Sequence, residues 1–367
     1  MRYLLGPSHP EAPMETAAQE REETLRLQVL LRPFQKLSPV TFYVDLIGTA
    51  VLAWGALWML AITPLSSPTA LWFLLAYIGF FRGHAFIHEV VHFRKKITGL
   101  GPLYNLLFGF ANRAPYYIHD PHQFHHLPTT FGTAKDPEYM VIAGKGRFYF
   151  FLPILSAPIL PLILLVRFGV LPIVSWAFPV AWREWLYRHL STLVVNPGYV
   201  RELRHAEDLR TALLQDTGCA LYLLSWIALG ISGILPVAFF VWMYAVIVAT
   251  TLVNIYRARV AHRYDNHSGE RLGPFAALRD STCVEGSVLD ILWAPIGLKY
   301  HSMHHIAPTI PYHNLGKAHA FLKAQLAEDH PYRQTILPNL VGGLRQFWRG
   351  VKPTARDTAG LPWPSHR

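Results

Sequence analysis

Long apolar runs alternate with polar, basic connections along the chain. A helix needs roughly 20 consecutive apolar residues to cross the hydrocarbon core of a bilayer, and several of the runs approach that length. The run at 168–181 is too short to cross alone, and Pro172 and Pro179 interrupt it. The apolar runs lie at about 40–62, 69–87, 148–166, 168–181, 217–233 and 235–256.

This pattern predicts an all-α, polytopic membrane protein. Runs 40–62 and 69–87 form one hairpin and runs 217–233 and 235–256 form a second, so about four helices cross the membrane. The composition agrees, because 52% of the residues are hydrophobic and only 15% are charged. Soluble domains carry about 25% charged residues.

The basic residues mark one side of the predicted membrane. The net charge is +10, but 32 of the 33 Lys and Arg residues lie before residue 40, in 82–147, in 183–210 or from 257 onward. The connections 63–68 and 230–236 carry none. This is the positive-inside distribution of a membrane protein, so both termini are expected in the cytosol. A nucleic-acid partner is not expected, since no basic stripe is interleaved with base-stacking aromatic residues.

Histidines in three short patterns supply the candidate chemistry. On a helix, residues at i, i+3 and i+4 share one face, and neutral imidazole is the commonest side-chain metal ligand. One pattern reads HxxxH and two read HxxHH, and together they exceed what one metal ion needs. Their histidines are His88 and His92; His122, His125 and His126; and His301, His304 and His305.

The three patterns must lie on one side of the membrane if they share a site. Each predicted hairpin returns the chain to the basic side, so the first hairpin ends just before His88. The segment 148–186 must then cross zero or two times, as a re-entrant or kinked helical hairpin. We therefore expect a cytosolic helical cap that holds all of the histidine patterns.

At these residues the chain resembles the membrane fatty acid desaturase family, which includes lipid hydroxylases and carotenoid-modifying oxygenases. The second pattern continues into Asp136-Pro137, and the third continues as His304-His305-Ile306-Ala307-Pro308-Thr309-Ile310-Pro311-Tyr312, similar to the family's YHxxHHxxPxxPY. His262 follows the last apolar run, where the family places one extra histidine ligand. The resemblance covers about 40–325. It divides the chain into a polar cytosolic segment (1–38), a desaturase-like domain (39–325) and a cytosolic C-terminal tail (326–367).

The resemblance implies a non-haem di-iron centre, with two Fe ions held by the eight patterned histidines and His262. It implies that dioxygen is the co-substrate and that two hydrogens are removed from a fatty acyl chain of a membrane lipid. Hydroxylation or ketolation of a lipid or carotenoid is the alternative on the same scaffold. Neither an HPGG haem-binding signature nor a CxxC pair is present, so a separate electron donor is expected, ferredoxin-like or of the cytochrome b type.

Carboxylates near metal-binding histidines orient the rings through the distal N–H. Five acidic residues are candidates for that role: Asp120, Asp136, Glu138, Glu285 and Asp290. His84 and His119 each lie one turn before a pattern. We interpret both as outer residues rather than ligands.

Three other classes of protein remain open from the sequence. The stretch 88–92 also reads HExxH, the zinc protease motif in which the glutamate is a general base, but a protease would leave both HxxHH patterns unexplained. Glu89-x-x-His92 and Glu202-x-x-His205 match the motif of soluble di-iron bundles. A metal transporter would place its ligands at the membrane midplane, whereas these histidines lie at the basic ends of the runs.

Overall fold

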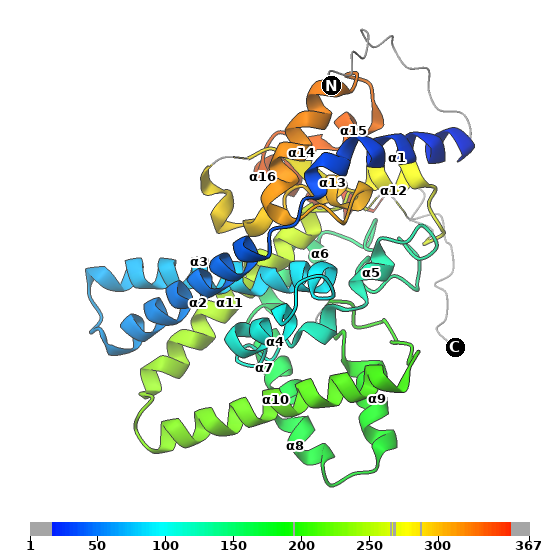
Figure 1. Cartoon of the computed structure of the whole chain (residues 1–367). Coiled ribbons are helices and arrows are strands. Elements are labelled where there is room, and N and C mark those ends of the chain that lie inside the picture. Colours follow the sequence, from blue (N-terminus) through cyan, green and yellow to red (C-terminus); the bar gives the residue numbers. More distant parts are fainter. Residues whose placement is uncertain (1–16, 194, 265, 267–268, 287, 354–367) are drawn as a thin grey trace.

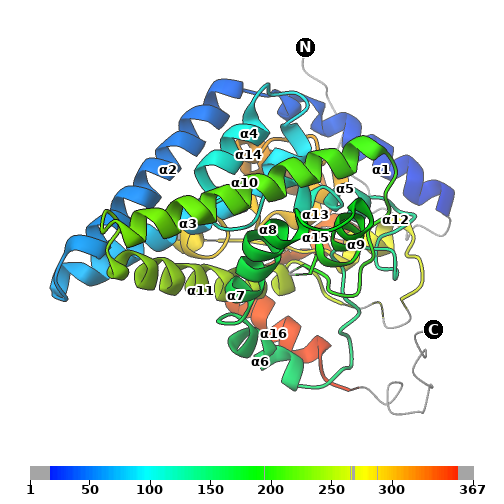
Figure 2. The ribbon, with the colours of Figure 1, turned by 90° about the horizontal axis from the view of Figure 1, so that it is seen from below.

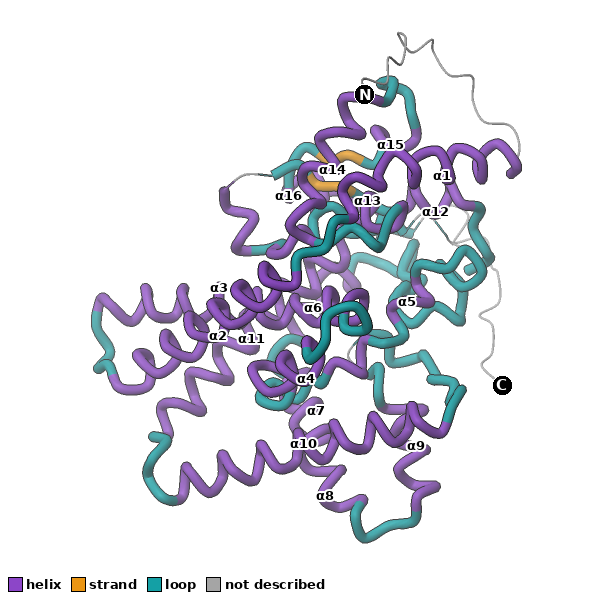
Figure 3. The backbone as a smooth tube through the Cα atoms, viewed as in Figure 1, coloured by secondary structure: helices purple, strands orange, loops and turns teal. Residues whose placement is uncertain are grey.

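Four long helices form the body of the molecule in the computed structural model, which describes residues 17–353 except 194, 265, 267–268 and 287. They are α2 (Pro39–Ile62), α3 (Ser67–Phe93), α10 (Ala206–Ile231) and α11 (Val237–Val260). All four are long and apolar enough to cross a membrane. The prediction of an all-α, multi-pass membrane protein is therefore confirmed, and the described strands are limited to two short ones in the cap (Figure 3).

The four helices make the two predicted hairpins. Helices α2 and α3 pack closely against each other, and α11 packs against both. The turns at the tips of the two hairpins lie on the same side of the molecule, at the left of Figures 1 and 2. The opposite ends of α3 and α11 carry histidines, so both hairpins present their functional ends to the cap.

The segment between the hairpins is bent, as predicted. It comprises α6 (Phe148–Ser156), α7 (Leu160–Leu164), the π-helical turn η4 (Leu165–Val170) and α8 (Leu171–Ser175), and its two halves meet at 56°. Helix α9 (Val180–Leu190) then leads back toward the start of α10.

A buried ion pair shows where this segment returns. Arg167 of η4 donates to Asp216 of α10 at 3.1 Å, and Asp216 accepts a 2.6 Å hydrogen bond from Tyr117. Tyr117 lies in the 3-10 turn η3 (Tyr116–His119), directly before the second histidine pattern. The first half of α10 therefore lies beside η3, at the level of the histidines.

The cap covers the histidine-bearing ends of α3 and α11 (Figure 1). Its elements are α1 (Ala17–Leu31), η1 (Arg32–Gln35), α5 (His122–His125), α12 (Pro274–Asp280), β1 (Cys283–Val284), η5 (Val288–Leu292), η6 (Pro295–Gly297), α13 (His301–Ile306), α14 (Tyr312–Gln325), α15 (Pro331–Gln334), β2 (Ile336–Leu337) and α16 (Leu340–Gly350). The short elements α4 (Leu100–Tyr104) and η2 (Asn105–Gly109) pack instead along α2 and α3.

Both terminal segments of the sequence-based division contribute to this cap. Leu27 and Leu31 of α1 are buried, and the side-chain amide of Gln28 donates to the carbonyl of Ile306 at 3.0 Å. In the segment 326–367, β2 pairs in parallel with β1, and α16 packs on α11. Residues 1–16 and 354–367 of these segments lie outside the described residues.

Candidate metal centre

The three histidine patterns and His262 lie on four separate pieces of chain that the fold brings together. The last turns of α3 carry His88 and His92, α5 and its C-cap carry the second pattern, and α13 carries the third. His262 follows α11 and is held by an isolated β-bridge to Ser281. All nine histidines that the sequence singled out therefore face a common centre.

The nine side chains divide into two groups whose nitrogens lie within 4.8 Å of one another in each group. The histidines in each group come from at least three of the four pieces of chain, so neither group can form before the tertiary fold does. The five-membered group is His88, His92, His122, His126 and His304, and the four-membered group is His125, His262, His301 and His305.

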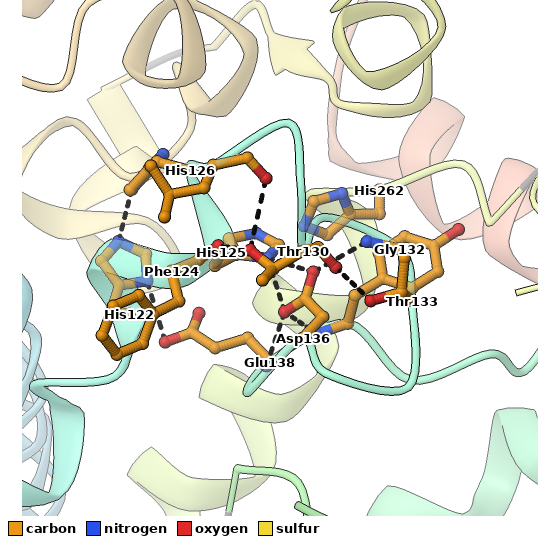
Figure 4. A network of polar contacts seen from close by, with 12 residues as sticks. His122, Phe124, His125, His126, Thr130, Gly132, Thr133, Asp136, Glu138 and His262 are labelled. Carbon is orange, nitrogen blue, oxygen red and sulfur yellow. Dashed lines mark hydrogen bonds and ion pairs between the residues drawn. The ribbon is translucent and has the colours of Figure 1, made fainter. Parts of the chain in front are cut away.

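Carboxylates hold the outer nitrogens of four of these rings (Figure 4 shows two of them). Nδ1 of His125 lies 2.9 Å from Asp136, and Nδ1 of His122 lies 2.8 Å from Glu138. In the same way, Nδ1 of His262 lies 3.3 Å from Asp280. Glu89 lies 3.1 Å from Nδ1 of its neighbour His88. A carboxylate at Nδ1 fixes the proton on that nitrogen and turns the Nε2 lone pair inward.

The loop after the second pattern is built around Asp136. This fully buried carboxylate also accepts hydrogen bonds from the backbone N–H groups of Gly132, Glu138 and Tyr139, at 2.9–3.0 Å. Gly132 has a φ of +72°, a left-handed conformation that glycine adopts without a Cβ penalty. The tight wrap around Asp136 therefore fixes His125 through its carboxylate.

The inner nitrogens of these rings lie close to one another and have few other hydrogen-bond partners, an arrangement that suits metal binding. Nε2 of His126 lies 2.9 Å from Nε2 of His122, and Nε2 of His301 lies 3.0 Å from Nε2 of His262. A carboxylate oxygen lies 2.8 Å from Nδ1 of His122 and 3.3 Å from Nδ1 of His262, and a proton on Nδ1 would leave Nε2 of each ring as a lone-pair acceptor. Nε2 of His125 is buried with no hydrogen-bond partner in the described structure. A cation satisfies such converging lone pairs.

Burial keeps most of the rings neutral, which is the form that binds metal. Burial first, and the neighbouring imidazoles second, hold the pKa well below its usual value for His122, His126, His301, His304 and His305. Burial also lowers the pKa of His262. For His125 burial is outweighed by the adjacent Asp136 carboxylate, so its pKa is raised.

The structure corrects the predicted set of orienting carboxylates. Asp136 and Glu138 contact the histidines, but the other three predicted residues do not. Asp120 pairs with Arg94 at 2.8 Å, while Glu285 pairs with Lys323, and Asp290 with Lys299. These three carboxylates neutralise basic side chains of the cap instead.

Sequence reasoning missed Glu89 and Asp280. Glu89 is adjacent to His88, but the HExxH pattern directed attention to a protease role for it. Asp280 lies 18 positions after His262, a separation that carries no signal of contact. Asp280 also accepts a 3.1 Å hydrogen bond from the Tyr139 hydroxyl, which links it to the loop around Asp136.

His84 and His119 lie outside the two groups. His119 is 3.3 Å from Glu138 and stacks on His122, with ring centroids 4.7 Å apart. His119 therefore contacts Glu138, the carboxylate that also contacts His122. These three residues form a third cluster. His84 lines a cavity beside the centre.

The rival motifs fit this geometry poorly. Glu89 is buried, and its second oxygen accepts the Tyr312 N–H at 3.1 Å, so it is occupied as a structural acceptor rather than free as a general base. The side chain of Glu202 is 68% exposed and lies beside Arg204. It belongs to the protein surface and not to a di-iron bundle.

A cavity of about 210 Å³ opens beside both histidine groups. His88 and His122 of the first group and His262 and His301 of the second line it. The remaining walls come mainly from α3, α7 and α11, with apolar side chains such as Phe81, Leu164 and Ile247. An apolar chain in this cavity would lie directly against the histidine groups.

Fold and site together define a multi-pass membrane protein with a histidine-box centre. The chain belongs to the fatty acid desaturase family, since the family described as fatty acid desaturase matches residues 64–336. Members of this family are oxidoreductases whose histidine boxes hold two irons. The chain is also similar to a ceramide hydroxylase of Caulobacter vibrioides (strain NA1000 / CB15N), with 32% identity over 334 residues, 88% of this chain and 92% of that protein.

Proposed function

We propose that this protein is a dioxygen-dependent lipid hydroxylase that acts on an N-acylated long-chain amino alcohol, the class to which ceramides belong. The observation that carries the proposal is the similarity to a ceramide hydroxylase along nearly the whole length of both chains. The cavity beside the histidine groups supports it, because apolar side chains such as Phe81, Leu164 and Ile247 line it. Desaturation is the second candidate, since the family as a whole is named for it.

The nine histidines would hold two irons, which supply the oxidising power that an unactivated C–H bond requires. Asp136, Glu138, Asp280 and Glu89 keep the rings oriented. The cavity walls exclude water and place the alkyl chain. Hydroxylation converts one C–H bond to C–OH, with the second oxygen atom leaving as water. The balance requires two electrons and two protons, and we propose that a separate ferredoxin-like or cytochrome b-type protein supplies the electrons.

Isotope labelling distinguishes the two reactions. Cells of a host with a known lipid profile, expressing the protein under ¹⁸O₂, are expected to accumulate a lipid that carries one ¹⁸O atom. Desaturation would instead give a lipid with two fewer hydrogens and no label, because both oxygen atoms leave as water. Mass spectrometry of the total lipids measures both products, and host cells with the empty vector are the control. A lipidome identical to that control would contradict lipid oxidation by this chain.

We also propose that the cap, the histidine groups and both termini face the cytosol. The distribution of the basic residues supports this orientation. The side chain of Leu65, at the tip of the first hairpin, is 83% exposed, and that of Ile234, at the tip of the second, is 62% exposed. Lys317 is exposed on the cap, so these three positions report on the two faces of the membrane.

Cysteine labelling tests the orientation. In right-side-out vesicles, Leu65→Cys and Ile234→Cys are expected to react with an impermeant thiol reagent, whereas Lys317→Cys reacts only after detergent is added. The unmodified protein provides the background, because Cys219 and Cys283 are both buried. Labelling of Lys317→Cys alone would show the inverted orientation.

A further inference from the structure

One face of α11 changes from apolar to polar as it approaches the histidines. Ile247, Thr250, Thr251, Asn254 and Arg257 all line the cavity. Their spacing of three or four residues places them on one stripe of the helix. His262 lies five residues after Arg257, about 7.5 Å along a helix axis, so the polar end of the cavity is the end next to the metal site.

The end of the cavity that lies away from the histidines is apolar on the walls formed by α3, α7 and α11. Phe81 lies seven residues before His88 on α3, about 10 Å away along the helix. The Tyr244 hydroxyl donates to the Pro158 carbonyl at 2.8 Å, which sets the start of α7 beside the apolar half of α11. Leu160 and Leu164 of α7 therefore lie at the same height along α11 as Ile247. A bound molecule would meet polar groups near the histidines and apolar groups away from them.

Arg257 lies in the last turn of α11, and its charge is not paired by a carboxylate at ion-pair distance among the described residues. Its Nε and Nη2 donate to Oδ1 of Asn254 at 3.2 and 2.9 Å. That arrangement leaves Nη1 of Arg257 and Nδ2 of Asn254 as donors at the cavity wall.

Two other charged residues line the cavity: Glu138, whose carboxylate is directed at His119 and His122, and Arg259, whose guanidinium lies over the Tyr264 ring. The donors of Asn254 and Arg257 match an oxygen acceptor. The lipid class of the proposed function supplies an uncharged one, an amide carbonyl or a hydroxyl.

We infer that Asn254 and Arg257 bind an uncharged oxygen-bearing head group of the lipid and thereby select a carbon within a few bonds of that group for oxidation. The alkyl chain then extends away from the metal site, toward Phe81, Leu164 and Ile247. This inference rests on the proposed function and deepens it, because it names the substrate contact and the region of the lipid that reacts. A lipid oxidised in the middle of its chain would instead need apolar walls next to the histidines.

The position of the oxidised carbon is the first test. Cells expressing the full chain are fed a ceramide and, separately, a free fatty acid of the same chain length, and tandem mass spectrometry locates the new oxygen or double bond. We expect oxidation of the ceramide close to its amide and hydroxyl groups, and little oxidation of the acid. Oxidation in the middle of either chain would overturn this inference and leave the proposed function intact. Absence of any oxidised lipid would overturn both.

Two variants test the residues themselves in isolated membranes. Asn254→Asp keeps the shape of the side chain but adds a carboxylate that pairs with Arg257 and occupies its donors. Arg257→Gln removes the cation. Each is expected to raise the KM for the ceramide by about 10- to 100-fold, the effect of losing a hydrogen bond to a charged group, with iron content and membrane abundance unchanged. Arg210→Gln is the control, because that side chain is 74% exposed on α10.

The comparison of KM with iron content separates substrate binding from a structural role. If Arg257→Gln reduces membrane abundance, the isosteric Asn254→Asp variant decides the outcome. A wild-type KM and an unchanged position of oxidation in Asn254→Asp would overturn the inference. So would a fall in iron content and kcat at constant KM, since that result would assign the pair to the support of the metal site.

Discussion

Replacing His305 with alanine is expected to abolish lipid oxidation and leave the protein in the membrane at its normal level. Nε2 of His305 lies 3.0 Å from Nε2 of His301 in the four-membered group, so its loss opens one metal position. Mutation of a residue that only orients a ligand costs about 10- to 100-fold in metal affinity or activity, and loss of a ligand is expected to exceed that range. Insertion is unaffected because His305 lies in α13, outside the membrane helices. Lipid products, iron per chain and membrane abundance are measured together.

Histidines outside the two groups provide the controls. His119→Ala and His84→Ala are expected to retain measurable activity, since neither ring belongs to the two groups. His189→Ala, at a half-buried position of α9 outside the histidine groups, is expected to match the wild type. Wild-type product levels from His305→Ala would refute its assignment as a ligand. Loss of both irons from His119→Ala or His84→Ala would add that residue to the ligand set.

Two iron ions per chain are expected in protein purified in mild detergent, and their removal by a chelator is expected to abolish activity. The reason is the division of nine histidines into a group of five and a group of four, each with inner nitrogens that lack other partners. Elemental analysis measures iron and zinc per chain, and re-addition of Fe(II) is expected to restore turnover.

Zinc requires a separate control, because it binds imidazole sites more tightly than Fe(II) does. Protein from zinc-limited, iron-supplemented cultures is therefore compared with protein from standard medium. One zinc per chain in both preparations, with no activity after iron is restored, would contradict the di-iron assignment.

The membrane helices and the gathering of the histidines were predictable from the sequence alone. Run length sets whether a helix crosses a bilayer, and that is a local property, so α2, α3, α10 and α11 follow from composition. The helical period places His122, His125 and His126 on one face of their helix, whatever position that helix takes in the fold. Because the histidine patterns were expected to share one site, the histidine-bearing ends of both hairpins were expected on the same side, and these ends meet under the cap in Figure 1.

The contacts between distant segments were decided by the tertiary structure. Asp280 reaches His262, whereas Asp120, Glu285 and Asp290, which looked equally suitable, pair with Arg94, Lys323 and Lys299. A carboxylate orients a histidine only if the fold places it within about 3 Å of Nδ1, and no spacing rule reports such a distance. The polar residues Thr250, Thr251 and Asn254 were likewise hidden in the apolar run 235–256. Only the packing of α3 and α7 against α11 makes these residues the wall of a cavity, because a side chain becomes part of a site through what faces it.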